Sequence, residues 1–317
     1  MRRLDENKII KIFQNSFNNR NFVPEDVEFF NFGKTKFVIS TDTFVESIDM
    51  PSQMSLRDVA RKSIVACVSD FASKGVSPRV AVVSVTIPRT YSESKIIELS
   101  KGLGSASKEF GFKILGGDTS EGKELSIQVT LVGFSKRVIP RGGSRRRDLI
   151  FVTGTFGYTK IGLHILLKNR PTSKNFAKKA TTRVFHPSAR LQFSLTASRF
   201  FSSAMDSSDG LSTTLHEMAR QSNHRFVVTK IPTTKEVIEF SKINKLNLHD
   251  LVFNGGEEFE IVFTSSPTNK KRLEKIAKRY GISLIEIGFV TNGGGVIRLS
   301  EGKSLPLKDA GWRHFKG

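Results

Sequence analysis

Residues 55–75 read SLRDVARKSIVACVSDFASKG, and this stretch decides how the first half of the chain folds. Ser55 followed by Asp58 resembles a capping box, and Gly75 with Pro78 after it ends a helix. The sequence therefore predicts a helix over 55–74. Its apolar residues share one face at helical spacing: Leu56, Val59, Ala60, Ile64, Cys67, Val68 and Phe71. Such a face has to be buried against a second layer of structure.

Apolar runs around this helix predict strands over 36–41, 79–88, 112–115 and 124–134, and a helix over 92–110. A second series begins near Asp148. It predicts strands over 149–153, 225–229, 259–264, 283–290 and 296–299, and helices over 157–167, 187–201 and 211–222. A basic loop is expected between the first two of these helices. The order predicts an α+β fold in two domains, 1–145 and 146–317, divided in the basic loop around Arg141 to Arg147.

Composition narrows the classes of protein. The 317 residues suffice for two cores, and no apolar run is long enough to span a membrane. The N-terminus lacks the apolar stretch of a signal peptide, and the single Cys67 cannot form an internal disulfide, so we expect a cytoplasmic protein. The formal charge of +20 suits nucleic acid, anionic membranes or phosphorylated metabolites, and equally a lysine-rich solvated surface.

Five aspartates carry the chemical signal. Asp42, Asp70, Asp118, Asp206 and Asp209 each adjoin a hydroxyl residue or a glycine, and each ends an apolar segment. Any one of them is also typical of a turn or a helix cap. If they converge, however, their repulsion calls for divalent cations, and ligand sets made of oxygen suit magnesium. That arrangement serves phosphoryl transfer, although the chain has neither a Walker loop nor the catalytic loop of protein kinases.

The order of the motifs resembles the thiamine-monophosphate kinase family, in particular its archaeal branch, within the aminoimidazole ribonucleotide synthetase-like superfamily. The resemblance runs over nearly the whole chain. The matching segments are ISTDTFVE at 39–46, VSDFASKG at 68–75, GGDTS at 116–120, VTGTFG at 152–157, DSSDGL at 206–211, GGEEFE at 255–260 and GWRHF at 311–315.

The resemblance implies an aminoimidazole ribonucleotide synthetase-like fold with two α/β sandwiches, the first contributing strands to a barrel in a homodimer. It also implies direct in-line transfer of phosphate from ATP to thiamine monophosphate, with several Mg2+ ions, to yield thiamine diphosphate. Neither a membrane nor nucleic acid is an expected partner. Residues 1–145 would bind ATP and metal, and residues 146–317 would add metal and substrate contacts.

Site residues follow from the resemblance by position. The implied metal ligands are Asp26, Ser40, Thr41, Asp42, Asp70, Asp118, Asp206 and Asp209. The implied ATP contacts are Gly117, Asp118, Arg141 and Ser208, and the implied substrate contacts are Asp49, Glu258 and Trp312.

Three departures from the family pattern leave points open. Pro24-Glu25-Asp26 replaces a glycine-led segment, so either Glu25 or Asp26 is the N-terminal ligand. Asp49 occupies a position where many bacterial members have histidine. The Arg145–Arg147 cluster replaces a more neutral stretch and has no assigned role. Trp312, the only tryptophan, suits stacking on a cationic ring and equally the plugging of a core edge.

Other readings remain. A hydrogenase-maturation enzyme typically ends in a reactive cysteine, whereas this sequence ends Phe315-Lys316-Gly317. A selenophosphate synthetase uses a reactive cysteine near its N-terminus, whereas Cys67 lies on an apolar helix face. The Gly256–Glu260 segment does not suit a purine-pathway synthetase. A basic nucleic-acid-binding protein, from a different class, would show salt-sensitive affinity and no ATP turnover.

Overall fold

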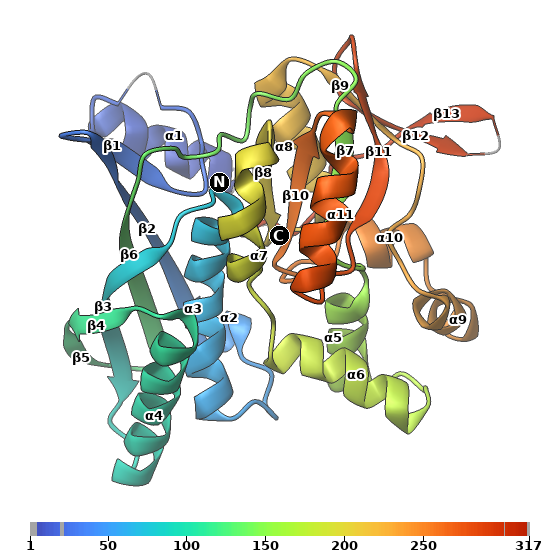
Figure 1. The fold of residues 1–317 in the computed structure, drawn as a ribbon. Helices are drawn as coiled ribbons and strands as arrows, with labels where there is room; N and C mark the ends of the chain where they lie inside the picture. The colour runs from blue at the N-terminus through green and yellow to red at the C-terminus, as the bar shows by residue number, and fades with distance from the viewer. Residues whose placement is uncertain (1–4, 20–21, 301, 316–317) are drawn as a thin grey trace.

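Two sheets, one from each half of the chain, organise the protein (Figure 1). The computed structural model describes residues 5–19, 22–300 and 302–315. The predicted α+β class with two sheets is confirmed. No helix in these ranges combines the length and hydropathy that a bilayer crossing requires.

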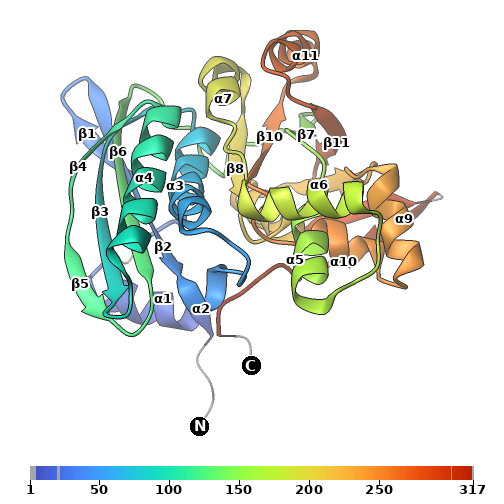
Figure 2. The ribbon, with the colours of Figure 1, turned by 90° about the horizontal axis from the view of Figure 1, so that it is seen from below.

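The N-terminal sheet has the strand order β1-β2-β6-β3-β4, with β5 also beside β3. Its strands are β1 (Glu28–Phe32), β2 (Thr35–Val45), β3 (Pro78–Pro88), β4 (Lys113–Gly116), β5 (Thr119–Gly122) and β6 (Ser126–Ser135). Ile127, Val129 and Leu131 alternate along β6 and are fully buried, as the period of two in a strand requires. They face the helices α3 (Leu56–Ser73) and α4 (Glu93–Phe110), which lie on one side of the sheet (Figure 2).

Helix α3 is the predicted central helix, and it begins as the sequence indicates: Ser55 Oγ accepts a hydrogen bond from the Asp58 N–H (3.1 Å). Val68 and Phe71 of α3 share one apolar core with Ile261 and Phe263 of β10 (Glu260–Ser265) in the second sheet. The two halves of the chain therefore meet along this helix, and residues late in α3 face both sheets.

The C-terminal sheet runs β13-β12-β9-β11-β7-β10-β8. Its other strands are β7 (Leu149–Val152), β8 (Ser203–Ser207), β9 (Arg225–Val228), β11 (Ile285–Thr291), β12 (Val296–Ser300) and β13 (Lys303–Pro306). A second core joins this sheet to α5 (Tyr158–Lys168), α8 (Leu211–Ser222), α9 (Lys235–Ile243) and α10 (Leu248–Phe253). Helices α7 (Leu191–Ala197) and α11 (Lys270–Arg279) belong to the core shared with α3.

Several segments correct the sequence prediction, among them strand β8, which carries Asp206 and which the sequence does not predict. The expected basic loop contains α6 (Lys174–Phe185), whose buried Phe176, Ala180 and Val184 form a stripe too sparse to stand out among its lysines. The expected helix over 187–201 is only α7 followed by one 3-10 turn, Ser198–Phe200. An unexpected helix, α1 (Glu6–Ser16), precedes the first sheet.

Candidate active site

Predicted aspartates from both halves of the chain converge beside α3. Asp70 lies near the C-terminal end of α3, and Asp206 lies on β8. Ser40 on β2 donates a hydrogen bond to Asp70 Oδ2 (2.6 Å), and Ser69 on α3 donates one to Asp206 Oδ2 (2.9 Å). These contacts join residues 30 and 137 positions apart. The two carboxylates are therefore held where the two sheets face each other across α3.

Burial and mutual repulsion dominate the electrostatics of this group. Burial, followed by the charges of Asp206, Asp42 and Asp26, raises the pKa of Asp70 well above its ordinary value. Burial and Asp26 raise the pKa of Asp206 to about 8. Burial, and then Glu6 of α1, raises the pKa of Asp209 to about 6. The carboxylates are thus crowded, short of positive charge and poised to receive cations.

Asp26 has its own cations. It pairs with Lys74 (3.0 Å) and with Arg141 (2.5 Å). Burial alone would raise the pKa of Asp26, but Lys74 and Arg141 outweigh it and leave the pKa lowered. Glu25 binds Lys74 Nζ (2.6 Å) and accepts a hydrogen bond from the Arg141 N–H (3.0 Å). Both candidate N-terminal ligands therefore lie in the site, with Asp26 the more deeply buried.

A second group of carboxylates lies beyond Asp42. Burial raises the pKa of Asp42, and the charges of Asp49 and Glu257 add to the rise, against a hydrogen bond from the Thr43 N–H (2.9 Å). Asp49 ends the short helix α2 (Glu46–Asp49), and its Oδ2 accepts a hydrogen bond from the Val45 N–H (2.8 Å). The surroundings of Asp42 are therefore acidic, with Asp49 and Glu257 both acting on it.

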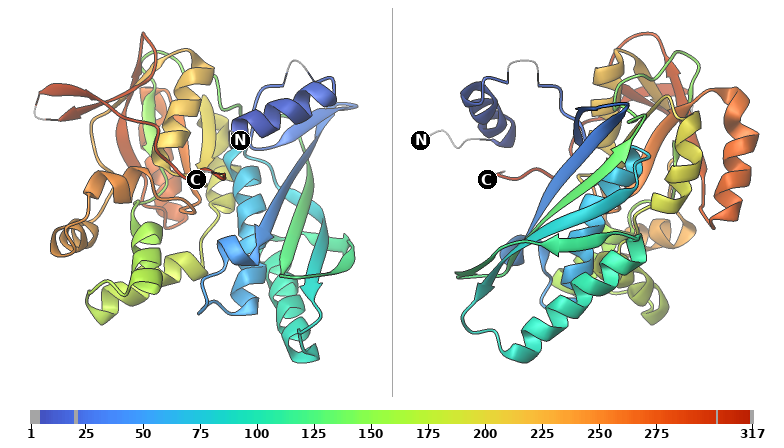
Figure 3. Two further views of the ribbon diagram at one scale, coloured as in Figure 1. Left: turned by 180° about the vertical axis from the view of Figure 1, so that it is seen from behind. Right: turned by 60° about the vertical axis from the view of Figure 1, so that its left-hand side comes forward.

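The loop after β8 forms a hydrogen bond with the C-terminal tail and holds it beside the site. The Asp209 carbonyl accepts a hydrogen bond from the Trp312 N–H (2.7 Å), and the Ser208 carbonyl accepts one from the Glu257 N–H (2.6 Å). The Trp312 side chain is 56% exposed, so it does not plug a core edge. Figure 3 shows α1 and the tail on the same side of the molecule. The predicted residues Ser208, Asp209 and Trp312 are thus neighbours.

Glu258 lies in a different environment, at the start of α5. Its side chain is buried and accepts hydrogen bonds from the N–H groups of Gly157 (2.7 Å) and Thr159 (3.2 Å) at the start of α5. Burial raises its pKa to about 7 despite these bonds. The contact of Glu258 with substrate remains a prediction. In the structure, the hydrogen bonds that its carboxylate accepts orient the start of α5.

Three predicted residues lie apart from the converging group. The Thr41 hydroxyl bonds Thr130 (3.0 Å), and because side chains alternate along a strand it lies opposite Ser40 and Asp42. Gly117 and Asp118 connect β4 to β5, and β6 and β3 separate them from Asp42 on β2. Three strand spacings amount to about 14 Å. Within one chain, Asp118 therefore does not join the other aspartates.

Sequence reasoning missed two buried lysines of the site. Lys74 is fully buried, lies one helical turn after Asp70 and pairs with Asp26 (3.0 Å). Lys62 is also buried, and it pairs with Glu257 (2.5 Å). The signal available in the sequence was that both are lysines placed on the inner side of an otherwise apolar helix.

The carboxylate and hydroxyl oxygens of these residues are of the kind that magnesium prefers. By themselves they do not form a complete metal site. In the described ranges, no three carboxylate, imidazole or thiol groups are arranged closely enough to hold a metal ion. Magnesium keeps several waters and binds through one or two carboxylates together with phosphate oxygens. The crowding of Asp70, Asp206 and Asp42, with their raised pKa values, fits ions that arrive with a phosphate chain.

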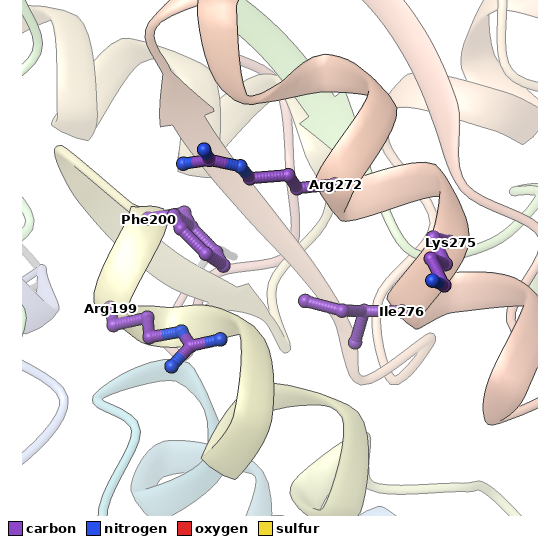
Figure 4. Close-up of a pocket in the computed structure, with 5 residues that line it drawn as sticks. All are labelled: Arg199, Phe200, Arg272, Lys275 and Ile276. Atoms are coloured by element: carbon purple, nitrogen blue, oxygen red, sulfur yellow. The ribbon is translucent and has the colours of Figure 1, made fainter.

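A hollow of about 480 Å³ lies elsewhere, between the end of α7 and α11 (Figure 4). It is lined by Arg199, Phe200, Arg272, Lys275 and Ile276. Its lining has no carboxylate, so it offers nothing to a metal ion. The aspartate group remains the candidate for chemistry.

Comparisons with known proteins show which sequences and folds this chain is similar to. Residues 25–135 match the family described as "AIR synthase related protein, N-terminal domain". The chain is 50% identical to a thiamine-monophosphate kinase of Nitrosopumilus maritimus over the full length of both chains. It is 33% identical to one of Pyrococcus horikoshii, covering 100% of this chain and 98% of the other. A solved structure described as "AaThiL complexed with AMPPCP and TMP" superposes with a TM-score of 0.86 at 25% identity, covering 98% of this chain and 97% of that one.

Proposed function

This chain belongs to the thiamine-monophosphate kinase family, and from that membership we propose that it transfers phosphate from ATP to thiamine monophosphate with the help of several Mg2+ ions. The family members that it matches are named for this activity, and a related solved structure is described as holding AMPPCP, an ATP analogue, and TMP. The observation that carries the proposal is the meeting of Asp42, Asp70 and Asp206 beside α3.

The metal-binding role of these residues follows from their crowding. Asp42, Asp70, Asp206 and Asp209 would hold Mg2+, with the Ser40 hydroxyl orienting Asp70. When bound, the ions would neutralise charge on the phosphates and align them for in-line transfer. Asp26 is the better N-terminal ligand than Glu25 because it lies deeper among the aspartates.

The protein's own cations would act on the phosphates as well. The Arg141 side chain is mostly buried and bonds Asp26 through its Nε (2.7 Å). A guanidinium held in this way can present its remaining donors to a phosphate oxygen. Ser208, next to Asp209, is partly exposed, and we propose that it also contacts ATP. We assign ATP and metal binding to a domain of residues 1–145, and further metal and substrate contacts to a domain of residues 146–317.

A homodimer would complete the site. The outer face of the N-terminal sheet, opposite α3 and α4, exposes apolar side chains, among them Phe30 (55%), Phe32 (63%), Val82 (45%) and Phe134 (45%). An exposed apolar face of this kind is typical of an interface. A second copy packed on it would bury these residues and could bring its own Gly117 and Asp118 toward the aspartates of the first. We also place the enzyme in the cytoplasm, because its one cysteine needs no oxidising compartment.

The activity itself is the first test. Purified protein mixed with ATP, Mg2+ and thiamine monophosphate is expected to produce thiamine diphosphate and ADP in equal amounts, measured by chromatography. Free thiamine is expected to be a poor substrate, because the acceptor is a phosphate. ATP hydrolysis without thiamine diphosphate would contradict the proposal, as would binding of RNA in place of turnover.

The dimer has a separate test. Val82→Lys places a charge in the middle of the outer face and is expected to give a monomer in light scattering, with phosphate transfer reduced alongside because Asp118 then has no partner site. Ile243→Lys, at a residue of α9 that is 60% exposed, is the matched control and is expected to change neither property. A fully active Val82→Lys monomer would exclude the shared site.

A further inference from the structure

We propose that the hollow between the end of α7 and α11 is a second site for a nucleotide, in which arginines bind the phosphates and Phe200 contacts the base. None of its residues belongs to the aspartate group, and the inference goes beyond the proposed function. The hollow of about 480 Å³ is lined by Arg199, Phe200, Arg272, Lys275 and Ile276. Sites for small molecules typically measure about 300–1,000 Å³, so its size suits such a ligand.

The hollow carries positive charge that no carboxylate of its own lining balances. Arg199, Arg272 and Lys275 contribute three cations. In the described ranges, none of these three side chains forms an ion pair. Glu274 is the only acidic residue of α11, and its charge acts on Lys270, one turn earlier in the helix. The three cations of the hollow are therefore available to an anion from outside the protein.

Two of the cations flank one aromatic ring. The Arg199 Cζ lies 4.8 Å from the centroid of the Phe200 ring, and the Arg272 Cζ lies 6.0 Å from it. Figure 4 shows Phe200 between the two arginines, with Ile276 on the facing helix. Guanidinium groups match the oxygens of phosphate, and both guanidinium planes and aromatic rings stack on bases. This combination suits a ligand that carries phosphates and a flat ring, which is the chemistry of a nucleotide.

Both walls of the hollow are fixed by hydrogen bonds of their own. The 3-10 turn that carries Arg199 and Phe200 is held by Arg137, whose Nη1 donates to the Arg199 carbonyl (3.2 Å). On the other wall, the hydroxyl of Tyr280, directly after α11, forms a hydrogen bond with that of Thr196 on α7 (2.8 Å). A ligand would therefore meet a site that is already formed, and its binding would order little more than the ends of the cationic side chains.

The test separates this site from the active site by leaving out Mg2+. Without metal, the crowded carboxylates around Asp70 repel a triphosphate, whereas the cationic hollow needs no metal. Wild-type protein in EDTA is expected to bind the ATP analogue AMPPCP at one site per chain in a calorimetric titration, with an affinity that falls as salt is added. Adenosine lacks the phosphates and inorganic tripolyphosphate lacks the ring, so each is expected to bind at least about tenfold more weakly.

Variants of the lining assign the binding to the hollow. Arg199→Gln and Arg272→Gln are each expected to weaken the titration by about tenfold, as for a lost hydrogen bond to a charged group. Phe200→Leu is expected to weaken the binding of AMPPCP but not that of tripolyphosphate, because only the base uses the ring. Lys271→Gln is the matched control, since it removes a charge from the same helix outside the lining, and it is expected to leave the titration unchanged.

A free nucleotide and a strand of RNA offer the same chemistry, and competition against AMPPCP distinguishes them. If ATP displaces the analogue as well as a short single-stranded RNA does, the ligand is the free nucleotide. If the RNA displaces it at lower concentration and Arg272→Gln weakens the RNA as well, the site takes a nucleotide of a strand. No binding in the absence of Mg2+ overturns the inference. Equal losses in Lys271→Gln and Arg272→Gln, or tripolyphosphate binding as tightly as AMPPCP, overturn it too, because the surface would then attract anions by its charge alone.

Discussion

Asp70→Asn is expected to reduce phosphate transfer by at least about a thousandfold, a loss of about 4 kcal/mol of transition-state stabilisation. Asp70 is buried among Asp206, Asp42 and Asp26, so it is the carboxylate best placed to share cations with all three. Asparagine keeps the size and can still accept the hydrogen bond from Ser40. What asparagine lacks is the negative charge that attracts Mg2+. The fall in turnover at saturating ATP and Mg2+, measured by steady-state kinetics, therefore reports the contribution of that charge.

The fold of Asp70→Asn is expected to survive. In metal-free protein near pH 8, its melting temperature is expected to equal or exceed that of wild type, because the amide removes repulsion among buried carboxylates. Asp58→Asn, in the first turn of the same helix, is the matched control and is expected to retain activity. Wild-type rates for folded Asp70→Asn would remove Asp70 from the metal site, and the kinase mechanism would need other ligands.

Stabilisation by Mg2+ together with a nonhydrolysable ATP analogue is expected to grow steeply as the pH rises from about 5 to about 9. The pKa of Asp206 is raised to about 8 and that of Asp209 to about 6, both above the ordinary 3.8. Between 3.8 and these values the folded chain holds more protons than the unfolded chain. The stability that these groups contribute to metal-free protein is therefore complete below about pH 4, and it is lost as the pH rises through about 6 and then about 8.

Metal ions compete with those protons for the carboxylates. As the pH rises, the stability of metal-free protein therefore falls, whereas the stabilisation by Mg2+ grows. Thermal unfolding of metal-free protein should show the melting temperature falling toward alkaline pH, and Mg2+ with the analogue should restore it most where it has fallen most. Asp206→Asn removes the group that titrates highest and is expected to flatten the metal-free profile above about pH 6. A gain from Mg2+ that is independent of pH in wild type would mean that these carboxylates are not its ligands.

Much of the fold could be predicted because its signals are local. The Ser55 cap, the apolar face of α3 and the alternation of Ile127, Val129 and Leu131 each depend on residues a few positions apart. Helix α6 was missed for the same reason, since its three buried residues make a weak local signal that only packing turns into a helix.

The composition of the site could be predicted as a set of residue types, but its geometry could not. Thr41 and Asp42 are adjacent in the chain, and strand alternation sends their side chains to opposite faces. Asp118 carries the same motif signal as Asp70, yet two strands separate it from the others. Spacing along the chain says nothing about such separations.

By itself, the sequence predicted the helix that carries Asp70 and the strand that leads to Asp42, and through motif order it determined the family, but it did not predict β8, the strand that carries Asp206. Only the tertiary structure decided which carboxylates lie together, that Lys74 and Lys62 accompany them, and that Glu257 rather than Glu258 acts on Asp42. The reason is that these placements depend on contacts across large sequence separations, such as Lys62 with Glu257 and Ser69 with Asp206. Burial then adds the electrostatic consequence, because a carboxylate becomes a strong attractor of cations only once its neighbours have excluded water.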